Sequence, residues 1–175
     1  MLEPLMPATM ADLDAVWQMY VDVCEQQAHD AYGPRWTLGV YPTREDVAEH
    51  IAAGELYVAL LDGQRAGAMA LVCHEDPEYA EVPWATPAAP DEVAVIHLLC
   101  VHPRARGHRL GLFLTQEAVR LARAAGKQVI HLDVVPGNLV ASRIYESVGF
   151  VHVCDHEIFY EDTGLMAFEM YEYVL

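Results

Sequence analysis

The feature that most constrains this chain is an apolar run that ends in a basic, glycine-containing loop and then enters a helix. The run extends from Val93 to Val101, and the loop is His102-Pro103-Arg104-Ala105-Arg106-Gly107-His108-Arg109. The next segment, Leu110 to Ala125, repeats apolar residues at helical spacing. A strand, a loop and a helix N-terminus in this order gather backbone N–H groups around one point. Such a point is a typical phosphate site.

This basic loop lies in an acidic chain. The 175 residues contain 10 Lys and Arg against 26 Asp and Glu, a formal net charge of −16. An anionic ligand is the simplest reason for a local cluster of Arg104, Arg106, Arg109 and Arg120. The global charge argues against nucleic acid as a partner, because the negative field would repel phosphates. The same field favours a cationic substrate such as an amine.

Length and composition predict one cytoplasmic domain, residues 1–175, without membrane contact. The chain is 54% hydrophobic, which suits a sizeable core. Its apolar runs are far shorter than the roughly 20 residues of a membrane span, and its N-terminus lacks the pattern of a secretion signal. The four cysteines are scattered and are best explained as thiols, mostly buried.

Hydrophobic periodicity predicts alternating helices and strands. Helices are expected after Thr9-Met10-Ala11-Asp12, from Thr43 to Gly54, and over 110–125 and 138–148; strands over 56–61, 65–73, 93–101, 129–135, 150–160 and 166–174. In the helix 138–148, we expect Val140, Ile144 and Val148 to face inward. Residues 32–42 and 75–90 are expected to be irregular. Two strand–helix–strand units between hairpins indicate a mixed α/β domain with one sheet.

Two motifs carry a resemblance to a known family. The first is Val101-His102-Pro103 followed by Arg106-Gly107-His108-Arg109-Leu110-Gly111; the second is Asn138, Ala141, Tyr145 and Gly149-Phe150. In these positions and this order the chain resembles the GNAT superfamily of N-acetyltransferases. The resemblance implies an α/β fold with a mixed sheet of about six to seven strands, helices on both faces, and a splayed strand pair that holds the cofactor. Arg109 departs from the motif: it stands where the family usually has glycine, so it is strained if that position needs positive φ, or adds a cation to the phosphate site.

The resemblance implies acetyl-coenzyme A as co-substrate and a set of residues that bind it. The diphosphate is expected on the backbone of Arg106, Gly107, His108, Arg109, Leu110 and Gly111. The pantetheine arm is expected along Leu99, Cys100 and Val101, with Asn138 also contacting it. Tyr145 is expected to protonate the departing thiolate. The alternatives are that Asn138 is only an N-cap and that Tyr145 is only a core aromatic.

His97 is the predicted general base. Strand alternation puts it with Val95 and Leu99, on the strand expected to hold the thioester, and an imidazole titrates near neutral pH. The alternative is a hydrogen-bonded core histidine. Weaker candidates are Asp91, Glu92 and Asp133. His102 and His108 flank the first motif as phosphate donors or as exposed residues, and the histidine spacing shows no metal pattern.

The predicted function is acetyl transfer from acetyl-coenzyme A to a primary amine, on a small molecule or a peptide N-terminus. Two alternatives stay open: a catalytically silent acetyl-coenzyme A sensor module, and an acyltransferase with another acyl donor or acceptor. A homodimer is a possible assembly. Residues 32–42, the loop 75–90 and the last strands are expected to line the acceptor pocket, and such regions vary freely on a shared fold.

Overall fold

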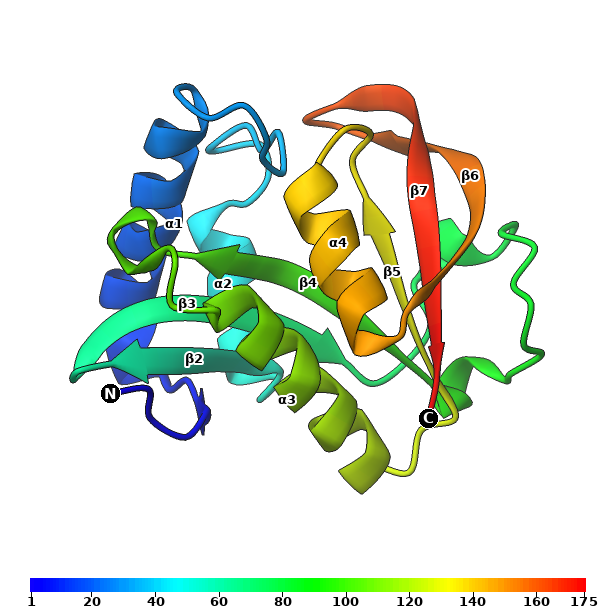
Figure 1. Ribbon diagram of the computed structural model, residues 1–175, viewed down its shortest axis with the longest axis horizontal. Helices are drawn as coiled ribbons and strands as arrows, with labels where there is room; N and C mark the ends of the chain where they lie inside the picture. The colour runs from blue at the N-terminus through cyan, green and yellow to red at the C-terminus, as the bar shows by residue number, and fades with distance from the viewer.

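A computed structural model describes residues 1–175 and contains one mixed sheet of seven strands with four α-helices (Figure 1). The strand order is β1-β2-β3-β4-β5-β7-β6. The strands are β1 (Met6–Pro7), β2 (Leu56–Leu61), β3 (Gln64–Val72), β4 (Val93–Val101), β5 (Val129–Val134), β6 (Val151–Tyr160) and β7 (Gly164–Val174). The helices are α1 (Leu13–Gln27), α2 (Arg44–Ala52), α3 (Leu110–Ala124) and α4 (Leu139–Val148). The predicted α/β fold and its central strand 93–101 are therefore confirmed. None of the four α-helices has the length and apolar composition that a membrane span requires.

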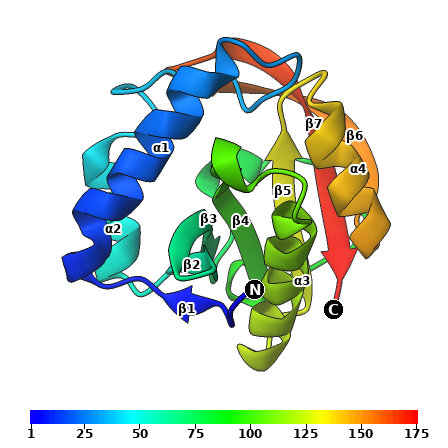
Figure 2. The ribbon, with the colours of Figure 1, turned by 60° about the vertical axis from the view of Figure 1, so that its left-hand side comes forward.

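The helices cover both faces of the sheet, α1 and α2 on one side and α3 and α4 on the other (Figure 2). Local sequence sets their ends: the Thr43 hydroxyl accepts from the Asp46 amide at the start of α2, and Gly149, at φ +114°, ends α4. The predicted inward face of α4 was wrong at one position. Val140 is 52% exposed and lines a cavity, because α4 borders the gap between two strands there.

The gap arises because β4 and β5, the parallel pair, stay together only at their starts. Their pairing runs from Val93↔Val129 to Val95↔His131, and beyond it the strands diverge (Figure 1). A β-bulge bends β4 where they part: its register with β3 shifts, and Leu98 adopts φ +54°. The Tyr20 hydroxyl of α1 donates to the Leu98 carbonyl at 2.8 Å and holds the bulge. The predicted splayed pair is confirmed.

The long connection between β3 and β4, residues 73–92, is irregular but firmly anchored. Tyr79, within this connection, is fully buried in the core. Trp84 stacks on His131 of β5, with ring centroids 3.6 Å apart, and Glu75 Oε2 lies 2.9 Å from His131 Nδ1. These contacts fix Asp76, the neighbour of Glu75, at the edge of the gap.

Candidate active site

A cavity of about 1220 Å³ opens where β4 and β5 separate. It is lined by the ends of β4 and β5, the β4–α3 loop and α4, and by residues 30–41, α2, the 73–92 connection and the β6–β7 turn. The predicted cofactor and catalytic residues line it, with the exception of His108. The structure thus brings together side chains that are up to 48 positions apart in the sequence, from His97 to Tyr145.

The N-terminus of α3 faces this cavity without a side-chain cap. Arg109 is the N-cap residue, and its side chain makes no capping hydrogen bond. The first N–H groups of a helix have no partner within the helix and carry the positive end of its dipole. Gly107 and Arg109 both have positive φ, +84° and +60°, so the loop curves its backbone around that end. This arrangement fits a phosphate group.

Arg109 therefore occupies a left-handed position, as its departure from the family motif suggested. A non-glycine residue in this region costs about 1 kcal/mol. The arginine also lines the cavity, so it places a cation beside the free helix end. Two positions further on, Gly111 lets α3 and α4 approach closely, because a Cβ there would lie 2.9 Å from Ile144 Cδ1.

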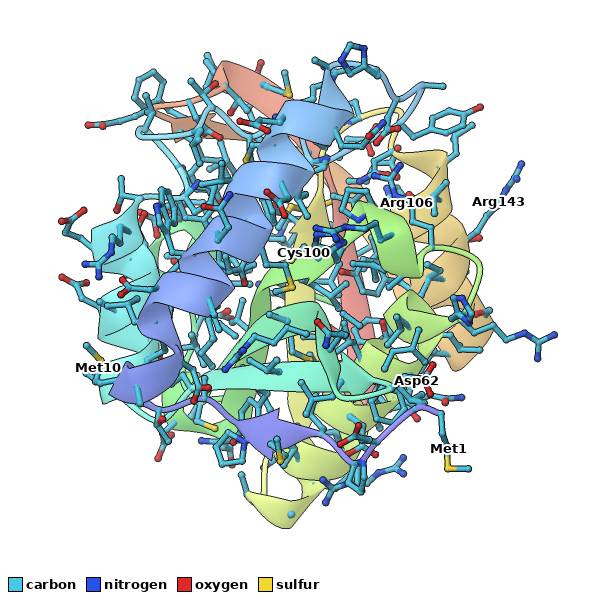
Figure 3. The ribbon with its side chains drawn as sticks, turned by 90° about the vertical axis from the view of Figure 1, so that its left-hand side faces the viewer. Met1, Met10, Asp62, Cys100, Arg106 and Arg143 are labelled. Atoms are coloured by element: carbon cyan, nitrogen blue, oxygen red, sulfur yellow. The ribbon has the colours of Figure 1, made fainter.

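The other arginines of the cluster are largely engaged by carboxylates. Arg106 lines the cavity and makes a two-pronged ion pair with Asp30, at 2.8 and 2.6 Å. Arg104 is 86% exposed and lies 3.9 Å from Asp22. Arg120 pairs with Glu117 on the outside of α3, at 2.8 Å. The basic cluster therefore points only partly at the cavity. Arg143 of α4 is also among the lining residues, with its side chain extending outward from the helix (Figure 3).

His97 lies at the other end of the cavity in contact with a carboxylate. Its Nε2 is 2.8 Å from Asp76 Oδ2, and the two side chains are only 21% and 14% exposed. Burial disfavours the charged imidazole, but the hydrogen bond and charge of Asp76, helped by Asp133 and Glu78, outweigh it and raise the pKa of His97. The contact with His97 lowers the pKa of Asp76 despite burial. Asp76 therefore favours the protonated form of His97.

Asp133 of β5 lines the same cavity as His97 and Tyr145. Burial raises the pKa of Asp133, and hydrogen bonds from the Tyr79 and Tyr160 hydroxyls oppose that rise in part. Its charge in turn helps to raise the pKa values of both His97 and Tyr145. Asp133 therefore links the two predicted catalytic side chains electrostatically.

Tyr145 and Asn138 come from α4. Tyr145 is 8% exposed, packs against Phe150 and Tyr171, and lines the cavity. Burial, and then the charge of Asp133, raises the pKa of Tyr145, so its hydroxyl stays protonated at neutral pH. The Asn138 side chain accepts from the Ala141 amide at 3.5 Å, which makes it the N-cap of α4, and it also lines the cavity.

Several weaker candidates lie away from the cavity. His102 Nε2 contacts Asp22 of α1 at 3.0 Å, and its Nδ1 accepts from the Arg104 amide, so this ring ties the loop to α1. Glu92 accepts from the Ala89 amide and from Gln128, outside the cavity. Asp91 is exposed and does not line the cavity. Of the carboxylates considered, only Asp133 faces it.

Sequence reasoning missed the residues that surround His97. Asp76, Glu78, Tyr41 and Tyr160 all line the cavity, and Tyr79 bonds Asp133 from below it. They come from irregular segments or from strand ends, where no periodicity marks an inward position. The segments 32–42 and 75–90, which the sequence assigns to the acceptor pocket, do contain Tyr41, Asp76 and Glu78. What singled out individual side chains was only indirect: a histidine inside an apolar strand requires a polar partner.

Comparison with known proteins agrees with this geometry. The family model described as "Acetyltransferase (GNAT) family" matches residues 15–150. The chain belongs to the GNAT acetyltransferase family. Members of this family use acetyl-coenzyme A as acetyl donor. A mycothiol acetyltransferase from Sanguibacter keddieii is 33% identical over 113 residues, which are 62% of this chain and 33% of that protein. The chain thus spans about one third of the length of this relative.

Solved structures of low identity share the fold. A GNAT-family acetyltransferase from Streptococcus agalactiae 2603 has a TM-score of 0.80 at 16% identity, over 99% of this chain and 95% of that one. A GNAT-family acetyltransferase from Listeria monocytogenes 4b F2365 has a TM-score of 0.75 at 17% identity, over 98% of this chain and 94% of that one. A putative acetyltransferase from Salmonella typhimurium, solved with its cofactor acetyl-CoA, has a TM-score of 0.68 at 18% identity, over 99% of this chain and 94% of that one.

Proposed function

We propose that this GNAT protein is an N-acetyltransferase that moves the acetyl group of acetyl-coenzyme A to a primary amine. The observation that carries the proposal is that His97 and Tyr145 line one cavity together with the uncapped N-terminus of α3. Such a transfer needs a basic helix end for the phosphates and a polar strand end for the cofactor arm. It also needs a tyrosine whose pKa is raised and a histidine that is paired with a carboxylate.

The residues that would hold acetyl-coenzyme A are those of the β4–α3 loop, the end of β4 and the start of α4. The N–H groups at the start of α3, with Arg109 beside them, suit the diphosphate. Leu99 to Val101 continue β4 beyond its pairing with β5, so this edge can bond the extended amide arm. When bound, the thioester supplies an activated acetyl group.

His97 and Tyr145 would handle the two protons of the transfer. The amine nitrogen forms a bond to the thioester carbonyl carbon, and the carbon–sulfur bond breaks. His97, once neutral, takes the proton that the amine loses, and Asp76 holds the ring in place. Tyr145 gives its proton to the departing sulfur, which the raised pKa of the phenol permits because the proton is still present at neutral pH.

The test is release of coenzyme A from acetyl-coenzyme A in the presence of primary amines. We expect Tyr145→Phe and His97→Gln each to lower kcat by roughly 10²-fold or more, the usual range for a lost general acid or base. His152→Gln is the matched control, because His152 is exposed on β6 and does not line the cavity. If acetyl-coenzyme A binds but no amine releases coenzyme A, the chain is a binding module instead.

A further inference from the structure

The cavity is electrostatically divided along its length. The arginines that line it, Arg106, Arg109 and Arg143, all come from the β4–α3 loop and α4. No arginine or lysine lines the part around His97. That part is instead lined by carboxylates from several elements: Asp46, Glu55, Asp76, Glu78, Asp133, Glu161 and Asp162. An ammonium group is the natural complement of this half, as phosphate is of the other.

Some of these carboxylates are already engaged by the protein. Asp76 pairs with His97, Glu55 lies 2.8 Å from His50 Nδ1, and Asp46 caps α2 through the Thr43 amide. Four remain without a basic partner of their own: Asp133, bonded only by tyrosines, Glu78, bonded to Asp76, and Glu161 and Asp162 in the β6–β7 turn. They approach the cavity from three separate segments of the chain.

Burying a carboxylate away from water costs free energy unless a cation or another group offsets its charge. The pKa values of Asp133 and Asp162 are raised mainly by burial, and that of Glu78 mainly by its hydrogen bond with Asp76. The negative charge also affects nearby hydroxyls. Burial is the largest cause that raises the pKa values of Tyr41 and Tyr160, and the charge of Asp133 is the next largest. A bound cation would relieve this repulsion.

Other features of the cavity also point to a ligand and not to a merely acidic surface. The Tyr145 side chain is more than nine-tenths buried, lines the cavity, and has no hydrogen-bond partner on its hydroxyl. Trp36 and Tyr41 contribute aromatic faces on the same side as the carboxylates, and such faces attract ammonium groups. No group of three His, Cys, Asp or Glu side chains is arranged to hold a metal ion, so an organic cation is the better match.

We propose that the acceptor is an amine that carries a second cationic group, such as a diamine, with Glu161 and Asp162 of the β6–β7 turn around its distal charge while the reacting amine lies at His97, beside Glu78 and Asp133. This inference rests on the proposed acetyltransferase function. It excludes α-amino acids and other acceptors with a carboxylate near the amine, because the unpaired carboxylates would repel them.

The experiment compares three acceptor series of equal carbon length: α,ω-diaminoalkanes, n-alkylamines and ω-amino acids, with coenzyme A release as readout. We expect the best diamine to have a kcat/KM at least tenfold above its monoamine, the amino acid to be poorest, and the preference to shrink as NaCl is raised, because salt screens charges. A monoamine or amino acid that matches the diamine overturns the inference but leaves the acetyltransferase function intact. No release with any acceptor overturns the function itself.

Variants locate the effect. Asp162→Asn and Glu161→Gln should each lower kcat/KM for the diamine several-fold and leave that for the monoamine nearly unchanged, because both residues line the cavity away from the His97–Asp76 pair. Asp91→Asn is the matched control, because Asp91 is exposed outside the cavity, and it should change neither value. A diamine preference that persists unchanged in both cavity variants contradicts the assignment to these carboxylates.

Discussion

At the scale of single residues, the contact that most affects chemistry is the one between His97 and Asp76. A histidine at position 97 could be a base or a core residue by sequence alone. In the structure it is both buried and paired, 2.8 Å from a carboxylate on another segment. That carboxylate raises the pKa of His97, so the pH range in which the imidazole is neutral and can act as a base lies higher than for an ordinary histidine.

This pairing predicts a pH effect of Asp76→Asn. In the wild type, kcat/KM should rise with pH through the raised pKa of His97. Without the Asp76 charge, burial remains and disfavours the imidazolium, so the limb should move to lower pH by about one unit or more. The measurement is a pH–rate profile corrected for the fraction of free amine. Asp91→Asn should leave the profile in place. A profile unchanged in Asp76→Asn would mean that Asp76 does not position the base.

At the scale of elements, the site depends on how α1 holds β4. The bulge at Leu98 turns β4 away from β5, and the Tyr20 hydroxyl of α1 is bonded to the carbonyl at its centre. Tyr20 is fully buried. The helix thus stabilises the shape of the slot from the opposite face of the sheet.

Tyr20→Phe should therefore weaken both the fold and cofactor binding. A buried carbonyl that loses its donor costs roughly 1–3 kcal/mol, so we expect a loss of that order in the free energy of unfolding. The affinity for acetyl-coenzyme A should fall with it, because β4 would be freer to straighten. Denaturant unfolding and calorimetric titration measure the two effects. Tyr57→Phe serves as the control, because Tyr57 on β2 is half-buried. Equal losses of stability and of affinity in the two variants would contradict the role of Tyr20.

At the scale of the whole molecule, residues 30–41, which are distant in sequence from β4 and β5, cross the gap between these two strands. Residues 30–41 reach both lips: Asp30 bonds Arg106 of the β4–α3 loop, and Arg35 donates to the Pro136 carbonyl after β5 at 3.1 Å. A ligand in the slot would contact β4, α3 and α4 together. Binding should therefore stabilise the entire domain and not only the loop.

A thermal-unfolding scan tests this directly. A ligand that binds only the native state at 100 times its Kd stabilises by about 2.7 kcal/mol, which corresponds to a rise in Tm of roughly 5–10 °C for a chain of this size. Coenzyme A should give a similar rise, because it shares the diphosphate and the arm. Acetyl phosphate, which lacks the arm, should give none. The absence of any rise with acetyl-coenzyme A would rule out the slot as its site.

The sequence by itself determined the order of the elements, the helix ends and the family. These depend on local rules: periodicity set α3 and β4, Thr43 and Asn138 set the starts of α2 and α4, and the two motifs lie on either side of one gap. It also showed Arg109 as an anomaly, and the structure gives that position a left-handed backbone.

Only the tertiary structure decided which side chains meet. Asp30 engages Arg106, and Asp76 engages His97, across 76 and 21 positions of the chain. Neither carboxylate belongs to a periodic segment, so nothing local marks it as inward-facing. The division of the cavity into a basic and an acidic half is of the same kind. It arises when separate loops, each only polar in sequence, are brought by the sheet and its anchors to a shared volume away from bulk water, where charge has its largest effect.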